Sequence, residues 1–279
     1  TSDDYAFIVT ELGTELARQN VKYAEVSFSP SGARWLGQVN ERVYMDGLSR
    51  GRRRVMDDHG IELNWIFDLT RDSRRFAELA DYATQVAIDG RQDGVVGIGL
   101  GGYDQYGPPE EFAKWFDMGL AAGLRSYPHA GEFAGPENIW GAIQALKAER
   151  IGHGIRAIDD DELMDHLVGN RIALDVCPTS NWRLGAVANE GEHPVKAMHN
   201  RGVIVTVNSD DPSLFNTTLT EEISLLITRV DLDLADVDAI IENGIDACFL
   251  DQDGKGRLRA QLQDQSQRLK NELGLASLL

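Results

Sequence analysis

Short runs of apolar and β-branched residues recur along the chain, and stretches with the spacing of helices separate them. Seven of these runs are rich in Val, Ile, Leu or aromatic residues and predict strands: Tyr23–Ser29, Glu62–Leu69, Gly94–Gly101, Arg125–Ala130, Arg150–His153, Ala173–Cys177 and Val203–Asn208. Several lack the alternation of apolar and polar positions that a half-exposed strand shows. Such continuous runs are typical of parallel strands that are covered on both faces.

The intervening stretches carry apolar residues at helical spacing. In Pro109–Gly123, for example, Phe112, Phe116 and Leu120 lie close to one helical face, with proline at the start and glycine at the end. The other predicted helices are Pro136–Ala148, Asp160–Val168, Thr220–Arg229, Leu234–Phe249 and Lys255–Leu273. Alternating strands and helices indicate an α/β fold with a parallel sheet. No linker or low-complexity segment interrupts the pattern, so the sequence predicts a single domain over residues 1–279.

Two architectures could hold such a sheet. An open, doubly wound sheet favours a glycine-rich phosphate loop after its first strand. The one candidate, Gly97–Gly102, lies within a central run, and no acidic residue follows on a later strand end at the expected distance. A barrel closes best with eight strands and carries polar residues at their C-terminal ends. We therefore predict a (β/α)8 TIM-type barrel, with seven strands recognisable and one missing.

Composition narrows the class of protein. A chain of 279 residues with 42% hydrophobic residues fits one barrel, which takes roughly 250 residues. The net charge of −18 argues against nucleic acid or an anionic membrane as a partner. Two cysteines suit a reducing compartment, no apolar run reaches the roughly 18 residues of a membrane span, and the first residues do not resemble a signal peptide. We expect a cytoplasmic protein, and its oligomeric state stays open.

Candidate chemistry begins at the predicted strand ends. His129 ends one strand, where an imidazole can bind Zn²⁺, and Glu132 follows at a distance that suits a proton donor and acceptor better than a second ligand. Taken alone, the pair also fits an ordinary loop histidine and a solvated glutamate. His153 lies between two glycines, which leave room for a close approach, and it could accept a proton from water. A satisfied core histidine is the alternative there.

Two further strand ends carry polar residues. Asp210 and Asp211 follow the last strand, where one carboxylate could bind a cation and the other a substrate, although this pair before a proline is also a common helix start. Cys177 ends another strand and is interpreted as a packing residue, because a nucleophilic cysteine needs a nearby base. Ser180 and Asn181 are expected to hold loops through side-chain hydrogen bonds.

Four stretches together resemble the signature series of the adenosine deaminase family, within the amidohydrolase barrels. They are His129–Glu132, Arg150–Gly154, Cys177–Asn181 and Asn208–Pro212, and their order and spacing are similar from Val21 onward. The stretch Gly97–Gly102 resembles the substrate-binding loop of the family. It departs at Gly99, where the family usually carries Asp, and at Tyr103-Asp104, where it usually carries Asp-Glu.

The resemblance implies one role for each matched residue. His129 and Asp210 would bind one Zn²⁺, Glu132 would pass a proton to N1 of a purine, and His153 would orient and help deprotonate the metal-bound water. Asp211 would bind N7 of the purine, and the backbone amide of Gly102 would bind N3. The implied reaction is zinc-dependent hydrolytic deamination of adenosine or a related adenine nucleoside, giving the inosine-type product and ammonia.

One family feature is missing from these 279 residues. The family opens with a strand ending in His-x-His, which supplies two more metal ligands, and none of the six histidines here forms that pattern. Tyr23–Pro30 resembles the second strand of the family, so the resemblance implies a barrel of the metal-dependent hydrolase kind whose first strand is absent here. Either the chain is an incomplete version of a longer protein or it is a natural truncation, and in both cases we expect zinc to be weakly bound or absent in this chain.

Three alternatives to adenosine deamination stay open. The Gly99–Gly102 loop also resembles bacterial relatives that act on 6-aminodeoxyfutalosine, which is the leading alternative. The second is a non-catalytic barrel that has lost its metal site. The third is another metal hydrolase of the same barrel type that acts on phosphoesters, and Glu132 with the Asp210-Asp211 pair favours the deaminase. Recognition of the sugar substituent is expected from loops around Tyr103-Asp104, Arg34-Trp35 and Trp182.

Overall fold

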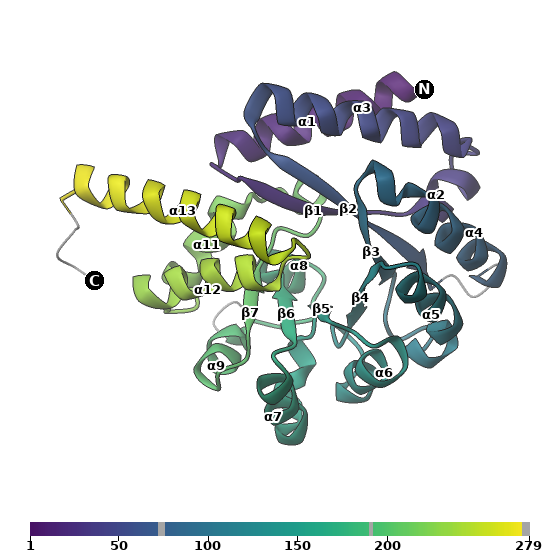
Figure 1. The fold of residues 1–279 in the computed structure, drawn as a ribbon. Coiled ribbons are helices and arrows are strands. Elements are labelled where there is room, and N and C mark those ends of the chain that lie inside the picture. The colour runs from purple at the N-terminus through teal and green to yellow at the C-terminus, as the bar shows by residue number, and fades with distance from the viewer. Residues whose placement is uncertain (72–75, 190–191, 275–279) are drawn as a thin grey trace. The chain divides into compact units, whose positions relative to one another are not determined.

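The structure is a computed structural model, and it describes residues 1–71, 76–189 and 192–274. The chain divides into two compact units, Thr1–Val176 and Cys177–Leu279, which are treated separately below. Figure 1 shows the elements of each unit along the chain. Within the described ranges, no helix combines the length and the apolar character that crossing a membrane requires.

The first unit contains six parallel strands that pair in chain order. They are β1 (Tyr23–Phe28), β2 (Glu62–Thr70), β3 (Val95–Gly101), β4 (Arg125–Ala130), β5 (Arg150–His153) and β6 (Ala173–Val176). Parallel pairing places the C-terminal ends of all six strands at one edge of the sheet. Every predicted strand of this unit is present, with ends that differ by one residue at most.

One helix precedes the first strand, and the others connect the strands. They are α1 (Ser2–Arg18), α2 (Pro30–Trp35), α3 (Glu41–His59), α4 (Phe76–Asp89), α5 (Ala113–Ala121), α6 (Pro136–Leu146) and α7 (Asp161–Asn170), with short 3-10 turns at Gly90–Asp93, Pro109–Phe112 and Ile155–Asp159. The sequence signals explain their ends. Thr1 and Asp4 form a capping box at α1, Asp160 caps α7, and Gly60 ends α3 in the left-handed conformation with φ 66°.

The core of this unit lies between the sheet and its helices. Alternate residues of β2, namely Leu63, Trp65, Phe67 and Leu69, join a buried cluster with residues of α1, α3 and α4. Because side chains alternate along a strand, the intervening residues of β2 lie on the opposite face of the sheet. Asp68 is one of these, and it becomes important at the candidate site.

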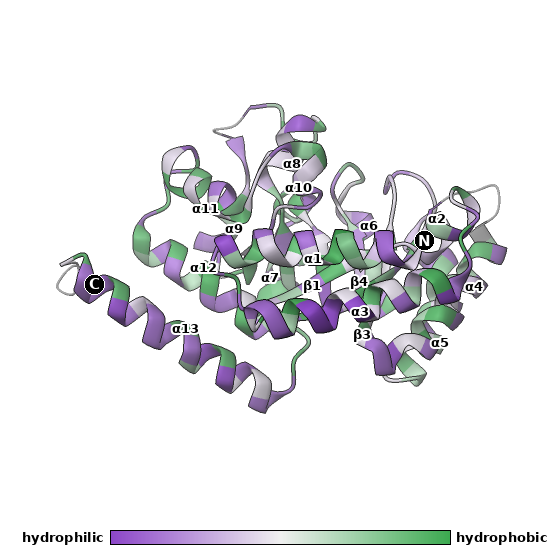
Figure 2. Cartoon of the chain, turned by 90° about the horizontal axis from the view of Figure 1, so that it is seen from above, coloured by the Kyte–Doolittle hydropathy of each residue, from purple (hydrophilic) through white to green (hydrophobic). Residues whose placement is uncertain are grey.

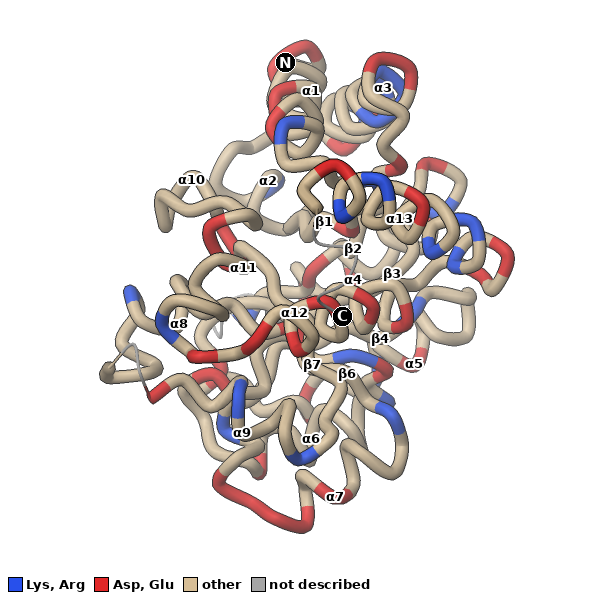
Figure 3. The backbone as a smooth tube through the Cα atoms, turned by 90° about the vertical axis from the view of Figure 1, so that its left-hand side faces the viewer, with Lys and Arg blue, Asp and Glu red and all other residues tan. Residues whose placement is uncertain are grey.

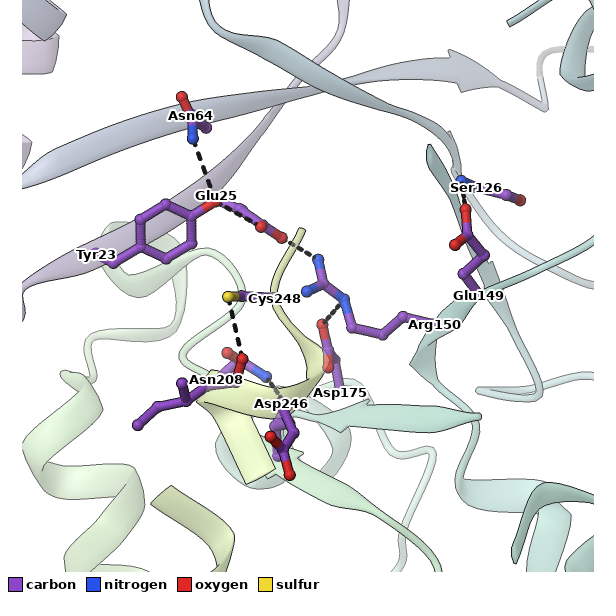
Figure 4. Close-up of polar contacts among 12 residues, drawn as sticks. Tyr23, Glu25, Asn64, Ser126, Glu149, Arg150, Asp175, Asn208, Asp246 and Cys248 are labelled. Atoms are coloured by element: carbon purple, nitrogen blue, oxygen red, sulfur yellow. Dashed lines mark hydrogen bonds and ion pairs between the residues drawn. The ribbon is translucent and has the colours of Figure 1, made fainter. Parts of the chain in front are cut away.

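A buried ion cluster shows that the sheet curls. The guanidinium of Arg150 on β5 lies 2.5 Å from the carboxylate of Glu25 on β1 and 2.9 Å from that of Asp175 on β6. In a flat sheet with strands about 4.8 Å apart, β1 and β5 would lie roughly 19 Å from each other. Figure 4 shows Arg150 reaching toward both carboxylates. Burial disfavours the charged guanidinium, but Asp175 and Glu25 outweigh this cost and raise the pKa of Arg150.

The second unit is mostly helical. It contains α8 (Pro178–Arg183), α9 (Val195–Asn200), β7 (Val205–Val207), α10 (Pro212–Phe215), α11 (Leu219–Thr228), α12 (Leu234–Ala247) and α13 (Gln252–Glu272). The predicted strand Val203–Asn208 is present but shorter. Helix α13 carries hydrophilic residues along most of its length, as Figure 2 shows, and Gly254 is its buried residue among those described.

Acidic residues are spread over both units rather than gathered in one place (Figure 3). Several lie in the first turns of helices, including Asp161 and Glu162 of α7 and Glu221 and Glu222 of α11. Negative charge there is favourable because the unpaired amides of a helix start carry partial positive charge. Part of the net charge of −18 therefore contributes to helix stability.

Candidate active site

His129 lies near the C-terminal end of β4, and a glycine on the next strand makes room for it. The register pairs His129 with Gly152 of β5. A Cβ atom at Gly152 would lie 2.4 Å from Cδ2 of the His129 ring, so any larger residue would displace the imidazole. The sequence predicted that the glycine before His153 leaves room beside His153. In the structure this glycine leaves room for the ring of His129.

His153 ends β5 in an unusual backbone conformation. Its φ of 63° places it in the left-handed region, which costs a residue with a side chain about 1–3 kcal/mol. The ring is buried, and its centroid lies 5.0 Å from that of His129 at an interplanar angle of 87°. Burial lowers the pKa of His153 to about 4, against the opposing charge of Asp104. The imidazole is therefore neutral near pH 7 and can accept a proton.

Glu132 lies in the turn after β4 and approaches His153. Its Oε2 is 3.7 Å from Nε2 of His153, and both side chains are buried. Because His153 is neutral near pH 7, this contact is not an ion pair there, and 3.7 Å exceeds the length of a hydrogen bond. The structure thus brings a carboxyl group and a neutral imidazole together beside the ring of His129.

Asp104 holds the turn that carries Glu132. Its carboxylate accepts hydrogen bonds from three successive backbone amides, those of Glu132 at 2.8 Å, Phe133 at 3.1 Å and Ala134 at 3.0 Å. The Asp104 side chain is 2% exposed, so its carboxylate is taken up by these contacts within the chain. Its neighbour Tyr103 is 44% exposed and packs against Phe133, with ring centroids 4.7 Å apart. Recognition of the sugar substituent by the loops around Tyr103-Asp104, Arg34-Trp35 and Trp182 stays a prediction.

Gly102 follows β3 with a φ of 92°, a conformation that glycine adopts without strain. Two hydrogen bonds hold this segment. The backbone amide of Arg71 donates to the carbonyl of Gly101 at 3.1 Å, and Nη1 of Arg71 donates to the carbonyl of Gly102 at 3.3 Å. The conformation of the Gly102 backbone is therefore fixed by the residue that follows β2.

The departure at Gly99 has a steric cause. Gly99 pairs with Asp68 of β2, and a Cβ atom at Gly99 would lie 1.9 Å from Oδ1 of Asp68. The buried Asp68 carboxylate thus occupies the space that any side chain at position 99 would need. A carboxylate on β2 and a glycine on β3 form a matched pair.

Asp210 and Asp211 belong to the second unit and follow β7. Asp210 has a φ of 54°, and its Oδ2 accepts a hydrogen bond of 2.6 Å from the hydroxyl of Ser180. Partial burial and the negative charge of Asp210 raise the pKa of Asp211. Ser180 therefore fixes one of the two adjacent carboxylates, in agreement with the loop-holding role expected for it.

A buried glutamate that the sequence analysis missed supports the same segment. Glu222 of α11 is fully buried and accepts hydrogen bonds from the amide of Thr179 at 3.0 Å and the hydroxyl of Thr217 at 2.6 Å. Asn181 lies 3.2 Å from the ring of His193. Glu222 belongs to no recognisable motif, and the amide of Thr179 that it binds is distant in sequence. The sequence singled out the position of Asp104 but not its hydrogen bonds to the amides of residues 132–134. An acidic residue within a predicted apolar helix face was the one available signal for Glu222.

Similar proteins agree with these observations. The family described as adenosine deaminase matches residues 1–265. The aminodeoxyfutalosine deaminase of Streptomyces avermitilis is 41% identical over 264 residues, which cover 94% of this chain and 73% of that protein. The adenine deaminase of Agrobacterium fabrum is 34% identical over 266 residues, covering 95% of this chain and 80% of that protein.

Solved structures show the same fold. The adenine deaminase of Arthrobacter aurescens superposes with a TM-score of 0.88 at 27% identity, covering 96% of this chain and 80% of that one. An amidohydrolase of Burkholderia ambifaria with bound zinc gives a TM-score of 0.91 at 28% identity, covering 98% of this chain and 76% of that one. The predicted TIM-type barrel class is confirmed. On the sequence match and the shared fold, the chain belongs to the adenosine deaminase family of hydrolases.

Proposed function

We propose that the chain catalyses the hydrolytic deamination of an adenine-type substrate, in which the amino group on C6 of the purine leaves as ammonia and oxygen from water replaces it. The observation that carries the proposal is the group formed by His129 with the buried Glu132 and His153 at the ends of β4 and β5. Relatives that match at least 94% of the chain and are named deaminases support it.

The first substrate to test is aminodeoxyfutalosine. Two relatives of that name are 41% and 38% identical to the chain, whereas the relatives named adenine deaminase are 34% identical or less. Adenosine, to which the motif resemblance points, is the second candidate. Both share the adenine ring and differ in what the ribose carries, so the same reacting groups would serve either.

The donor types fit a metal such as zinc. His129 and Asp210 offer an imidazole and a carboxylate, which Zn²⁺ binds readily. The absence of a side chain at Gly152 leaves room for the His129 ring, and the hydroxyl of Ser180 holds the Asp210 carboxylate. These two residues would hold the metal, which supplies acidification of a bound water molecule when it is present. The roles of the remaining residues do not depend on further ligands.

The reacting and recognising groups have separate tasks. Glu132 would transfer a proton to N1 of the purine, and His153, neutral near pH 7, would accept a proton during attack on C6. The amide of Gly102 would donate to N3. Purine N7 is a hydrogen-bond acceptor, so Asp211 would contact it through a protonated carboxyl group. The buried setting of Glu132 and His153 keeps bulk water from competing for these protons.

The proposal includes the cellular compartment and the class of partner. Both cysteines, Cys177 and Cys248, are buried thiols, which suits the reducing cytoplasm. The net charge of −18 supports a small-molecule substrate over nucleic acid or an anionic membrane.

An absorbance assay tests the proposal. Purified protein with supplied zinc is mixed with aminodeoxyfutalosine, adenosine or adenine, and the ultraviolet change of the purine and the released ammonia are followed together. We expect turnover of at least one adenine nucleoside, with aminodeoxyfutalosine the fastest. If none of the three compounds shows an absorbance change or releases ammonia, the proposal is overturned and a non-catalytic barrel is favoured.

A further inference from the structure

We infer that Arg71 is a positioning residue that fixes the substrate-binding loop and the His129 strand end relative to each other, an inference that rests on the proposed function. Arg71 comes directly after β2 and its side chain is 5% exposed. Sequence reasoning gave it no role, because it lies in none of the four matched stretches.

The side chain of Arg71 uses each of its three nitrogens for a different carbonyl group. Nη2 donates to His129 at 2.8 Å, Nη1 to Gly102 at 3.3 Å and Nε to Gly107 at 3.1 Å. The acceptors belong to two segments, the end of β4 and the connection after β3. A guanidinium is planar and its donors have fixed directions, so one side chain sets the relative orientation of both segments.

The backbone of Arg71 adds a fourth contact to the same loop. Its amide donates to the carbonyl of Gly101 at 3.1 Å. That carbonyl shares a rigid peptide plane with the amide of Gly102, the group proposed to bind N3 of the purine. Arg71 therefore orients the Gly101–Gly102 peptide with its backbone and the carbonyl of Gly102 with its side chain.

Acidic side chains around Arg71 favour its charged form. Burial lowers the pKa of Arg71 to about 10, and the charges of Asp104, Asp68 and Glu132 oppose that shift, so the side chain is charged near neutral pH. Asp104 meanwhile binds the amides of residues 132–134. Arg71 thus holds the carbonyl of His129, which lies just before the turn that follows β4. Asp104 holds the amides within that turn.

Arg52 is a control at the opposite end of β2. Its Nη2 donates to the side chain of Asn64 at 2.9 Å and its Nε to the carbonyl of Leu63. Removing Arg52 also deletes a hydrogen-bonding guanidinium, one that is half-buried and lies at a distance along β2 from the candidate site. A loss that Arg71→Ala shows and Arg52→Ala does not is therefore specific to position.

Hydrogen exchange tests the inference without any need for activity. In the 279-residue chain, we expect Arg71→Ala to speed amide exchange in residues 102–107 and 130–134 by at least about tenfold, with the rest of the first unit unchanged. Arg52→Ala should leave both segments protected. Exchange in Arg71→Ala that matches the wild type, or that rises evenly over residues 1–176, would overturn the inference.

Kinetics supply the second readout once a nucleoside substrate is found. We expect Arg71→Ala to lower kcat/KM by about 10²-fold, the scale of a misplacement near 1 Å, with the larger share in kcat. Added guanidinium should restore part of kcat in Arg71→Ala and none in Arg52→Ala, and Arg71→Lys should lie between Arg71→Ala and the wild type. If the wild type turns over no substrate, the proposed function fails, and hydrogen exchange alone decides the role of Arg71.

Discussion

Individual residues at the candidate site adopt conformations that a chain avoids without a reason. His153 and Asp210 both have positive φ values, at 63° and 54°; His153 ends β5, and Asp210 lies in the segment after β7. Other positive-φ residues with side chains, such as Lys147 and Arg171, cap helix ends, where this conformation is common. Strain away from helix ends is typical of functional residues, which supports roles for His153 and Asp210 beyond packing.

The role of Glu132 can be tested by one isosteric change. Glu132→Gln keeps the size and the backbone contact to Asp104 but cannot carry a proton between water and N1. We expect kcat to fall by roughly 10²-fold or more while product binding, measured by calorimetry, changes little. Turnover near the wild-type value would remove Glu132 from the mechanism.

Asp104 should be a strong contributor to stability. Asp104→Ala leaves the three amides of residues 132–134 without their acceptor, and each hydrogen bond to a charged group contributes about 1.5–3 kcal/mol. We expect urea unfolding to show a loss of at least about 3 kcal/mol.

A carboxylate with one comparable contact provides the control for Asp104. Asp233 caps α12 and accepts one amide, that of Asp236 at 2.8 Å, in an exposed position. Asp233→Ala should lower the free energy of unfolding clearly less. Equal losses in the two variants would show that the three buried hydrogen bonds of Asp104 stabilise the fold no more than the single exposed one of Asp233.

At the scale of elements, β2 and β3 are matched to each other through the pair Asp68 and Gly99. The two residues are paired in the sheet register. The carboxylate of Asp68 fills the space that a side chain at position 99 would need. Arg71 follows the same strand directly. One strand and the residue after it thus bring two buried ionisable side chains to the candidate site.

The fit between the two strands predicts a coupled pair of substitutions. Gly99→Ala would place a methyl group 1.9 Å from Oδ1 of Asp68, and overpacking of this kind costs about 1–3 kcal/mol. In an Asp68→Ala background the space is free, so Gly99→Ala should cost much less there. Unfolding of the four variants in urea gives the coupling, expected at about 0.5–3 kcal/mol.

Gly101 serves as the control on the same strand. A Cβ atom there would lie 3.6 Å from Asp68, an ordinary contact. Gly101→Ala should therefore show little coupling to Asp68→Ala. Additive effects for both glycines would contradict the steric explanation.

At the scale of the whole molecule, the number of metal ligands limits how tightly zinc can bind. The proposed ligands are His129 and Asp210, and these 279 residues contain no His-x-His pattern. Structural and catalytic zinc sites use at least three protein ligands. We expect the chain to lose zinc to a mild chelator during dialysis, whereas a version extended by a His-x-His strand should retain about one zinc per chain.

Metal analysis after dialysis, by emission spectroscopy, measures this difference. His129→Ala should weaken the retention of zinc in the extended version. Stoichiometric zinc that resists the chelator in the 279-residue chain would show that other residues complete the site.

The sequence alone determined the class of fold and the candidate residues. Apolar runs at regular intervals predicted all seven strands, because burial of a parallel sheet on both faces leaves a strong local pattern. The polar residues at their ends, among them His129, Glu132 and His153, were visible for the same reason, since the strand pattern stops where they begin. The helices before β3, α1 to α4, were not assigned from the pattern.

The tertiary structure alone decided which residues hold the site in shape. Arg71, Asp104 and Glu222 act through backbone groups 28 to 58 residues away or on separate elements. A backbone carbonyl or amide has the same chemistry in every residue, so nothing in the sequence marks which of them a buried charge will meet. The match of Asp68 to Gly99 is hidden likewise, because it depends on the register of two strands, and register is a property of the folded sheet.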